Sequence, residues 1–304
     1  MTGLRTFLRK KIHTRRRGSQ SQSMETQEPD KKISPVKKKK QFEDKYCQLY
    51  RLGDGGQGSV YMGYRKEDFV HVAIKHIPQT LVFREDDDRS KMPLEVLFMK
   101  MSQQAGGSVG QSASISLLDH YDLEEELIIV MECPFPAVDL LNYSKSRGGT
   151  LEEEEARLFF KQLVEAVREL DANKIFHADI KMENILVDIS SGVPRLRIID
   201  FGLSMFINDG DTIEDIFPGA PCYDPPEWYW SSVYSSRPVT VWQMGVVLHD
   251  MLHRDFNTTF FLENGLRISQ ELSPNCQNVL RLCLAEDPQQ RPTLEQLLSH
   301  SWLE

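Results

Sequence analysis

Residues 177–202 read HADIKMENILVDISSGVPRLRIIDFG, and the other motifs of the chain are best understood from this stretch. Asp179, Lys181 and Asn184 fall on one short loop, and a hairpin of two apolar strands then leads to Asp200. Phosphoryl transfer from ATP needs a carboxylate at the attacking hydroxyl and oxygen ligands that hold Mg²⁺ on the phosphates. We therefore expect Asp179 to accept the hydroxyl proton, and Asn184 and Asp200 to bind the metal. An Asp-rich surface turn would explain any one of these residues but not the spacing of all four.

The composition of the 304 residues is that of an ordinary soluble globular protein, and the length allows two lobes around a cleft. No run of eighteen or more apolar residues predicts a membrane span, and the N-terminus is too basic and too poor in apolar residues for a secretory signal. The five cysteines form no CxxC pair. We expect reduced thiols, and a cytoplasmic or nuclear location.

Charge is divided unevenly along the chain. Residues 1–40 hold 13 Lys or Arg and 3 acids, whereas the remainder holds 23 basic and 42 acidic residues. We expect a disordered basic tail over residues 1–44, which serves as a nuclear import signal, binds acidic lipid or nucleic acid, or only aids solubility. The folded domain then covers 45–304, with lobes at about 45–132 and 137–304 and a hinge at about 132–136. Its acidic charge favours basic substrates.

A glycine-rich loop follows the tail. In YRLGDGGQGSVYMGYR (50–65), Gly53, Gly55 and Gly58 stand in GxGxxG order, with Val60 two residues later. Such a loop can bring backbone amides close to a polyphosphate, although it also occurs in dinucleotide folds and simple hairpin turns. Here strand residues follow where a dinucleotide fold needs a helix, and the β run VAIK ends on Lys75. This pattern favours an ATP site.

A helix that carries the partner of Lys75 is predicted at SKMPLEVLFMKM (90–101). Its apolar residues recur at i, i+3, i+4 and i+7: Leu94, Leu97, Phe98 and Met101. Glu95 borders this stripe, so we expect its carboxylate to reach inward and hold Lys75 against the α and β phosphates. The acids at 85–88 are rivals, but they lie outside the periodic segment.

The strand LIIVMECP ends at Pro134, where a two-lobed nucleotide enzyme has its hinge. Pro134 has no N–H, so the adenine keeps the carbonyl of Glu132 as a partner but loses one donor. We expect this loss to cost about 1 kcal/mol in ATP affinity. Met131 is expected to limit access behind the adenine.

The C-terminal half reads as mainly helical. Thr150 and Glu153 predict a capping box before a long amphipathic helix, and VTVWQMGVVLHDML predicts a buried central helix. We expect Arg291 to pair with Glu227 of the PPE triplet, which would make Arg291 a stability residue.

The motifs GDGGQGSV, VAIK, HADIKMEN, DFG, PPE and QRPT occur in this order over residues 46–304, and the chain resembles eukaryotic protein kinases. It is most similar to the Pim serine/threonine kinases, through the hinge ECPFP, VAIKHI, PPEW, and a helix reading VW where most kinases have DVW. The resemblance implies an α+β two-lobed fold, with a small β-rich N-lobe and a larger helical C-lobe. It also implies ATP and Mg²⁺, and a non-specific serine/threonine kinase that acts on basic peptides without activation-loop phosphorylation. We expect a monomer, with no nucleic-acid partner.

The resemblance also assigns roles to individual positions. The catalytic set is Asp179, Lys181, Lys75 and Glu95, with Lys181 steadying the γ-phosphate, and the metal ligands are Asn184 and Asp200. The cofactor-binding set is Leu52, Gly53, Gly55, Gly58, Val60, Ala73, Lys75, Met131, Glu132, Pro134, Asp139, Glu183 and Leu186. Of the acids that the family uses for basic peptides, Asp139, Glu183 and Asp255 are present, whereas Asn142 replaces one.

Three departures from the family pattern leave other functions open. Ala178 stands where kinases usually have an Arg that binds a phosphorylated activation loop, and Thr240 replaces the usual Asp that anchors the catalytic loop. The segment after the central helix, HRDFNTTFFLENGLRIS, is short. The main alternative is therefore a pseudokinase that acts as a nucleotide-binding scaffold, and a weaker one is a phosphotransferase for small molecules. All the residues of the phosphoryl-transfer template are present, which favours catalysis.

Overall fold

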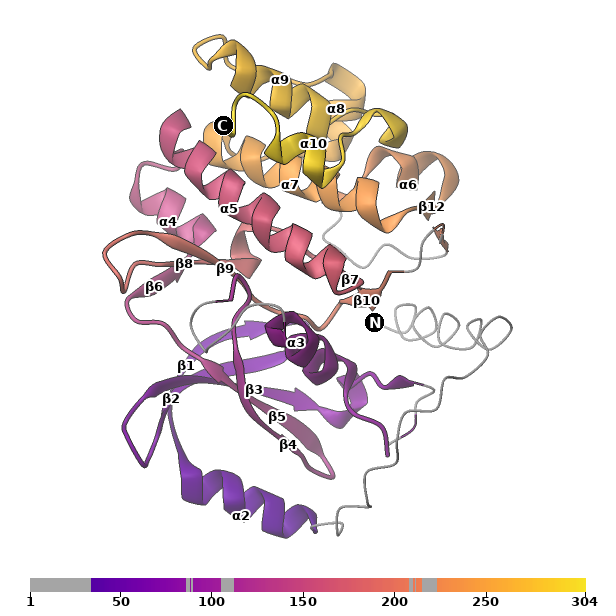
Figure 1. Ribbon diagram of the computed structural model, residues 1–304. Helices are drawn as coiled ribbons and strands as arrows, with labels where there is room; N and C mark the ends of the chain where they lie inside the picture. Colours follow the sequence, from indigo (N-terminus) through magenta and orange to yellow (C-terminus); the bar gives the residue numbers. More distant parts are fainter. Residues whose placement is uncertain are drawn as a thin grey trace. The chain divides into compact units, whose positions relative to one another are not determined.

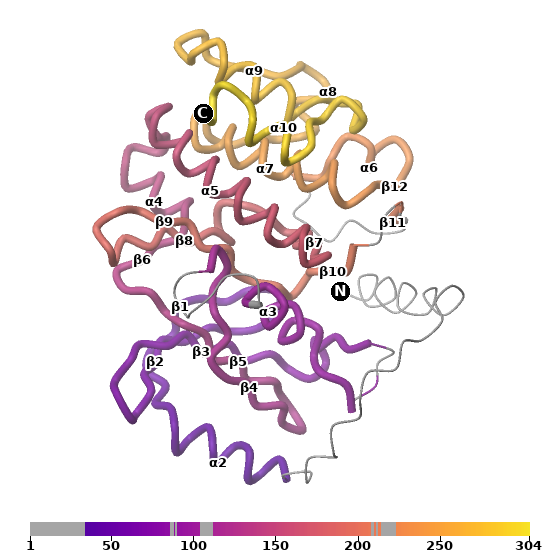
Figure 2. Tube along the Cα trace, viewed as in Figure 1, coloured from indigo at the N-terminus to yellow at the C-terminus, as the bar shows by residue number. Residues whose placement is uncertain are grey.

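The computed structural model describes residues 34–85, 88, 90–104, 112–207, 210, 212–214 and 223–304. They form two compact units (Figures 1 and 2). The first comprises the described residues up to Lys100 together with Ser116–Cys133, and the second comprises those of Met101–Ile115 together with Pro134–Glu304. The first unit is rich in β-strands and the second is mainly helical, which confirms the predicted α+β class.

An antiparallel sheet of five strands forms most of the first unit, in the order β1-β2-β3-β5-β4. The strands are β1 (Tyr46–Gly55), β2 (Gly58–Arg65), β3 (His71–Pro78), β4 (Leu117–Asp122) and β5 (Glu126–Glu132). A short 3₁₀ turn, η2 (Gln79–Leu81), follows β3, and helix α3 covers Leu94–Gln104. Lys75 lies opposite Val60 of β2 and Ile129 of β5, so the central strand of the sheet carries it.

Helix α2 (Pro35–Lys45) corrects the prediction of disorder up to residue 44. Pro35 suits the first helical position because its missing N–H has no partner there in any helix. The helix buries Phe42 among Tyr46, Tyr121 and other apolar residues of the sheet, and Lys45 pairs with Asp119 at 2.8 Å. One aromatic anchor in a lysine-rich segment was too weak a signal to predict this packing. The part of the predicted tail at residues 1–33 lies outside the described residues.

The second unit contains seven of the described α-helices. These are α4 (Leu140–Ser146), α5 (Glu153–Ala172), α6 (Pro226–Ser231), α7 (Ser236–His253), α8 (Thr258–Asn264), α9 (Pro274–Cys283) and α10 (Leu294–Leu298). Helix α7 is buried over most of its length, as its apolar sequence predicts, and α5 and α9 both contact it. A Cβ on Gly245 would lie 2.7 Å from the Cβ of Cys283, so this glycine allows α9 to approach α7 closely.

Short strands connect these helices. Strands β6 (Ala137–Asp139), β8 (Ile185–Asp188) and β9 (Arg195–Ile198) form a three-stranded sheet, and η4 (Met182–Asn184) leads into β8. Strand β7 (Ile175–Phe176) pairs with β10 (Met205–Phe206), and β11 (Ile213–Glu214) pairs with β12 (Val233–Tyr234). The β8–β9 hairpin is the one predicted from the sequence between Asn184 and Asp200.

The predicted capping box at the start of α5 is wrong. The N-cap is Glu152, and the carboxylate of Glu153 instead accepts hydrogen bonds from Ser273 and from Nε1 of Trp302, at 2.9 Å for the indole. The distant contacts are formed in place of the local cap, because the Glu153 carboxylate accepts three hydrogen bonds in this position. Helix α10 does begin with a capping box, since Thr293 and Gln296 bond reciprocally.

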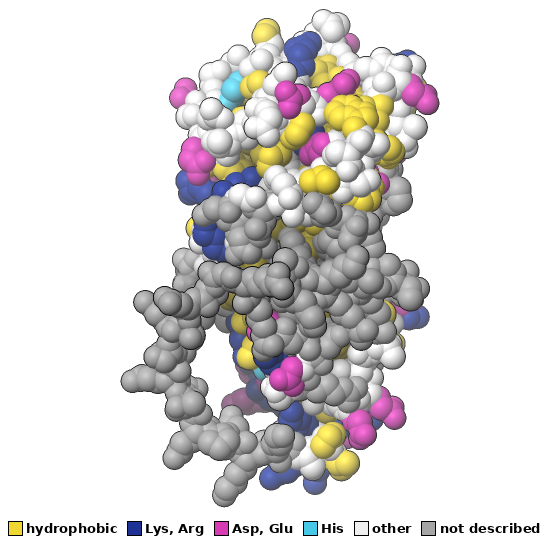
Figure 3. All heavy atoms as spheres, turned by 90° about the vertical axis from the view of Figure 1, so that its right-hand side faces the viewer, with side chains coloured by type: hydrophobic (Ala, Val, Ile, Leu, Met, Phe, Trp, Pro, Cys, Tyr) yellow, Lys and Arg dark blue, Asp and Glu magenta, His cyan; other side chains and the backbone are white. Residues whose placement is uncertain are grey.

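On the face shown in Figure 3, the described residues present Lys, Arg, Asp and Glu side chains interspersed with exposed hydrophobic ones. Within the described part of the chain, no helix is long and apolar enough to cross a membrane.

Candidate active site

The first unit holds the predicted pair of Lys75 and Glu95. Nζ of Lys75 lies 2.6 Å from Oε1 of Glu95, and the two side chains are only 6% and 10% exposed. The structure thus joins β3 to the first turn of α3 through one buried ion pair, as predicted. The predicted apolar stripe is only partly right, since α3 buries Val96, Phe98 and Met99 most completely. Oε1 of Gln57 accepts a further hydrogen bond from Nζ at 3.4 Å. Sequence reasoning missed Gln57, and its place inside the glycine-rich loop was the available signal.

The glycine-rich loop is the turn between β1 and β2. Gly58 has φ of +148°, and a Cβ there would lie 2.1 Å from the carbonyl oxygen of His76, so the sheet itself requires glycine. At Gly53 the position of a Cβ is open, with no atom within 4 Å. The sheet therefore does not explain the glycine at position 53. Leu52 is 49% exposed and Val60 is half-buried on the two strands beside the turn.

In the second unit, the catalytic loop brings three of the predicted side chains together. Oδ2 of Asp179 accepts hydrogen bonds from Nζ of Lys181 at 2.8 Å and from Nδ2 of Asn184 at 2.7 Å. Nδ2 of Asn184 also donates to the carbonyl oxygen of Asp179 at 2.9 Å. Because both acceptors require a donor, the amide orientation of Asn184 is fixed and its Oδ1 remains as an oxygen ligand. Oδ1 of Asp179 has no hydrogen bond among the described residues, so it can accept a hydroxyl proton.

His177 and Gln243 hold this loop by its backbone. Nδ1 of His177 accepts the N–H of Asp179 at 3.3 Å, and its Nε2 donates to the carbonyl oxygen of Ile199 at 3.0 Å. Burial lowers the pKa of His177, so the ring stays neutral and keeps this tautomer. Nε2 of Gln243, on α7, donates to the carbonyl oxygen of Ala178 at 3.0 Å. Gln243 was not predicted, because it is one polar residue in a helix that reads as apolar nearly all round.

Ala178 and Thr240 lie where the sequence departs from the kinase pattern. Ala178 is completely buried and has φ of +68°, a backbone conformation that residues other than glycine rarely adopt. The hydroxyl of Thr240 donates to the carbonyl oxygen of Ser236 at 2.8 Å, within its own helix. The described structure therefore anchors the loop through Gln243 and shows no hydrogen bond from Thr240 to it.

The β8–β9 hairpin brings Asp200 back to Asn184. Ile185 pairs with Ile198, and the N–H of Ile199 donates to the carbonyl oxygen of Asn184 at 3.0 Å. An amide oxygen and a carboxylate on neighbouring segments are hard ligands, which suit Mg²⁺. Among the described residues no group of three or more His, Cys, Asp or Glu could hold a metal. Asn184 and Asp200 would therefore suit Mg²⁺ that is bound mainly by a nucleotide's phosphates.

The predicted adenine-contacting segment lies at the end of β5. Met131 pairs with Ala73 of β3 and is 8% exposed, and Oε1 of Glu132 accepts the N–H of Ser116 at 2.6 Å. The first unit ends at Cys133 and the second resumes at Pro134, so the chain passes between units where the sequence predicts a hinge.

The acids proposed for nucleotide and peptide binding have different surroundings. The carboxylate of Asp139 caps α4 and accepts hydrogen bonds from the backbone N–H and the side-chain amide of Asn142, at 2.9 and 2.7 Å. Asp139 lies opposite the half-buried Leu186 in the β6–β8 pairing. Glu183 and Asp255 are exposed. The replacement at Asn142 thus supplies a partner that engages the neighbouring carboxylate.

The predicted pair of Glu227 and Arg291 is present and bidentate. Nη1 and Nη2 of Arg291 lie 2.8 and 2.6 Å from the two carboxylate oxygens. Both residues are buried, and Nη1 also donates to the carbonyl oxygen of Pro238. The pair ties α6 to the segment before α10, which is a structural role.

Comparisons with known proteins agree with this geometry. The family model described as "Protein kinase domain" matches residues 46–303. The chain is 36% identical to the serine/threonine-protein kinase pim-2 of Danio rerio, over 87% of this chain and 86% of that protein. It is 32% identical to the serine/threonine-protein kinase prk-2 of Caenorhabditis elegans, over 86% of this chain and 59% of that protein. It is 28% identical to the serine/threonine-protein kinase PSK2 of Saccharomyces cerevisiae, over 90% of this chain and 25% of that protein.

Proposed function

This chain belongs to the protein kinase family, and we propose that it is an active, Pim-like serine/threonine kinase that transfers the γ-phosphate of ATP to basic peptides. The hydrogen-bonded group of Asp179, Lys181 and Asn184 is the observation that carries this proposal. It presents one carboxylate oxygen for a hydroxyl proton, one ammonium for a phosphate and one amide oxygen for a metal.

In the proposed reaction, Asp179 orients the Ser or Thr hydroxyl and accepts its proton, and Lys181 neutralises charge on the transferred phosphate. Lys75, held by Glu95, positions the α and β phosphates, and the glycine-rich loop covers them. Asn184 and Asp200 would hold Mg²⁺, which would offset the negative charge of the phosphates. The adenine would lie between Ala73, Met131 and the carbonyl of Glu132.

Preference for basic peptides is proposed from the acidic folded part of the chain and from Glu183 and Asp255. Because the carboxylate of Asp139 caps α4 and binds Asn142, we assign Asp139 a smaller share of this preference. A positional-scanning peptide library tests this ranking. Replacing Glu183 or Asp255 by Gln or Asn should relax the preference for Arg more than Asp139→Asn does, and the reverse order would contradict the assignment.

Activity without phosphorylation of the activation segment is also proposed. Ala178 has no cationic side chain to bind a phosphate, and its backbone is anchored by Gln243 instead. Treatment of the purified protein with a phosphatase should leave the turnover number unchanged. A loss of activity on this treatment would contradict the proposal.

The main test is transfer itself. Mg-ATP and an Arg-rich Ser peptide should yield phosphopeptide, and Asp179→Asn should lower kcat by about 10²–10⁴-fold with little change in nucleotide affinity. Asp44→Asn, an exposed substitution on α2, is the matched control and should retain full activity. Tight nucleotide binding without transfer by the unaltered chain would instead favour the scaffold function.

We further propose a cytoplasmic or nuclear location that depends on the basic residues before α2. A fluorescent fusion lacking residues 1–33 keeps α2 and its contacts with the sheet. It should shift toward the cytoplasm. An unchanged distribution would exclude nuclear import by this segment.

A further inference from the structure

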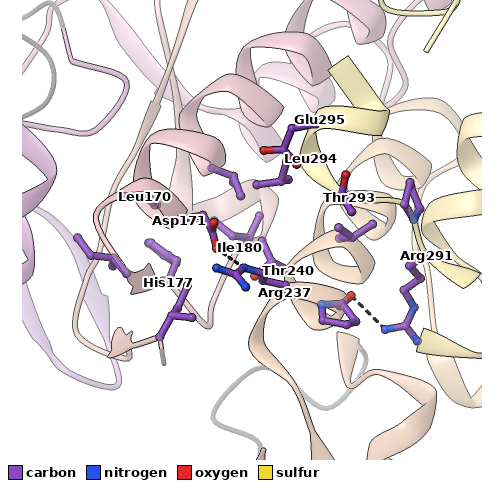
Figure 4. Close-up of a pocket in the computed structure, with 16 residues that line it drawn as sticks. Leu170, Asp171, His177, Ile180, Arg237, Thr240, Arg291, Thr293, Leu294 and Glu295 are labelled. Carbon is purple, nitrogen blue, oxygen red and sulfur yellow. Dashed lines mark hydrogen bonds and ion pairs between the residues drawn. The ribbon is translucent and has the colours of Figure 1, made fainter. Parts of the chain in front are cut away.

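A cavity of about 380 Å³ lies in the second unit, beside His177 and Ile180 of the catalytic loop (Figure 4). All sixteen residues that line it belong to the second unit. Its walls come from the end of α5, β7, the catalytic loop, the start of α7 and the start of α10. The volume is within the range of pockets that bind small molecules.

The inner wall of this cavity is apolar. Its most buried members are Val167, Leu170, Ile175, Ile180 and Val241, each no more than 4% exposed. The polar groups beside them are already engaged. Both ring nitrogens of His177 are hydrogen-bonded, and the hydroxyl of Thr240 donates within α7. A ligand body that enters the cavity therefore meets apolar surface and should itself be apolar.

Two acids and two arginines line the outer part of the cavity, and three of these four charges are paired. Asp171 accepts a hydrogen bond from Nε of Arg237 at 2.8 Å, which the dashed line in Figure 4 marks. Arg291 also lines the cavity, but its guanidinium is paired with the carboxylate of Glu227. Glu295 is exposed, and its carboxylate has no ion pair or hydrogen bond among the residues that the structure describes. Its charge is thus the one that remains for a ligand.

We propose that this cavity binds a small organic cation with an apolar ring body, of the arylalkylamine class. The rings would fill the space between α5, α7 and α10, and the ammonium would lie beside Glu295. Two lining residues, His177 and Ile180, flank Asp179 in the sequence, so an occupied cavity restrains the backbone of the catalytic loop. The inference concerns binding and does not depend on whether the chain transfers phosphate.

The test uses the full chain and three matched probes: 4-phenylbenzylamine, 4-phenylbenzyl alcohol and 4-phenylbenzoic acid. Titration calorimetry is performed with a non-hydrolysable ATP analogue and Mg²⁺ in excess, so that the nucleotide site is filled. The amine should bind at least tenfold more tightly than the alcohol, and the acid should bind most weakly. Equal affinities, or the acid as the tightest probe, would overturn the proposed ligand class.

Two variants locate the binding. Leu294→Trp, at the half-buried start of α10, should fill the cavity and abolish binding of the amine. Glu295→Gln should weaken the amine about fivefold and leave the alcohol unchanged, whereas Glu263→Gln, on the exposed side of α8, should change neither. Unaltered binding to Leu294→Trp, or equal losses for both glutamate variants, would overturn the site.

Hydrogen exchange of the backbone amides distinguishes loss of binding from loss of folding. In the unaltered chain, the amine should slow exchange of the backbone amides in residues 177–184, and in folded Glu295→Gln it should do so only at proportionately higher concentration. Binding of the amine without any protection of this segment would contradict the coupling to the catalytic loop.

Discussion

The two units hold their shares of the proposed site in different ways. In the first unit, Lys75 and Glu95 are 20 positions apart and come from a strand and a helix, so one buried ion pair sets their geometry. In the second unit, Asp179, Lys181 and Asn184 lie within six residues, and hydrogen bonds between side chains and backbone groups fix the loop that carries them. The first arrangement depends on one ion pair, and the second on several hydrogen bonds to the main chain.

This difference predicts what substitutions do. Changes at the ion pair should disturb both stability and nucleotide positioning, because a buried charge loses its partner. Substitutions of Asp179, Lys181 or Asn184 should lower phosphate transfer while the fold persists, since hydrogen bonds to the backbone of the loop hold it in place. The following predictions test this contrast, from the largest expected effect to the smallest.

The largest effect is expected from loss of the metal. Chelation by EDTA should abolish phosphate transfer and added Mg²⁺ should restore it, because the phosphate charge is otherwise not offset. Asp200→Asn should lower transfer at saturating Mg-ATP at least a hundredfold while the free energy of unfolding changes little. Transfer assays and urea denaturation measure the two quantities. Full activity in EDTA would show that Asn184 and Asp200 do not serve a metal.

Breaking the ion pair of Lys75 and Glu95 should mainly lower the free energy of unfolding. Glu95→Gln breaks the ion pair with Lys75, whose side chain is 6% exposed, and breaking a buried pair costs about 3–5 kcal/mol. Lys181→Met is the matched change in the second unit. Its cost should be smaller, because Asn184 still donates to Asp179 and the Lys181 side chain is 24% exposed. Urea denaturation compares the two, and equal losses would remove the contrast between the units.

The pH dependence of stability should depend on His177. Burial lowers its pKa below the ordinary value of 6.5, so the folded chain stays neutral there while the unfolded chain binds a proton. Stability is therefore fully present above pH 6.5 and falls as the pH decreases toward the folded pKa, by at most about 1.4 kcal/mol per pH unit.

The variant His177→Asn should reduce this slope between pH 7.5 and 5.5. His120 and His253, whose pKa values burial also lowers, should supply the slope that remains. Denaturation curves at several pH values provide the comparison. An identical slope in the variant would mean that His177 takes up a proton in the folded state.

The smallest effect is expected where the chain passes from one unit to the other. Pro134→Ala restores a backbone N–H that can donate to the adenine, so ATP should bind about fivefold more tightly. Calorimetric titration with Mg-ATP measures this change. An unchanged or weaker affinity would show that the hinge contact has been assigned to the wrong residue.

Local patterns allowed much of this structure to be predicted. The loop at 177–184 and the β8–β9 hairpin follow from adjacent motifs, and the pair of Lys75 and Glu95 follows from a strand and an amphipathic helix. The strand continues past Lys75 to Pro78, although the sequence predicted its end at Lys75. What was missed depends on distant contacts. Glu153 accepts hydrogen bonds from Ser273 and Trp302 instead of forming the expected capping box. Phe42 packs against the sheet and holds a lysine-rich helix there.

Two further residues were beyond sequence reasoning for a related cause. Gln243 and Gln57 act through one hydrogen bond each, to the carbonyl of Ala178 and to Lys75. A single amide in a helix or a turn has no periodicity that marks it as important, and only the folded geometry identifies its partner.

The central claim is that the residues of both units act on one Mg-bound ATP. The most direct measurement is a crystal structure of the chain with Mg²⁺ and a non-hydrolysable ATP analogue. We expect Nζ of Lys75 within hydrogen-bond distance of the α or β phosphate, and Asn184 and Asp200 as ligands of a metal on the same nucleotide. A bound nucleotide with Asp200 turned away from the metal and Lys75 far from the phosphates would contradict the account.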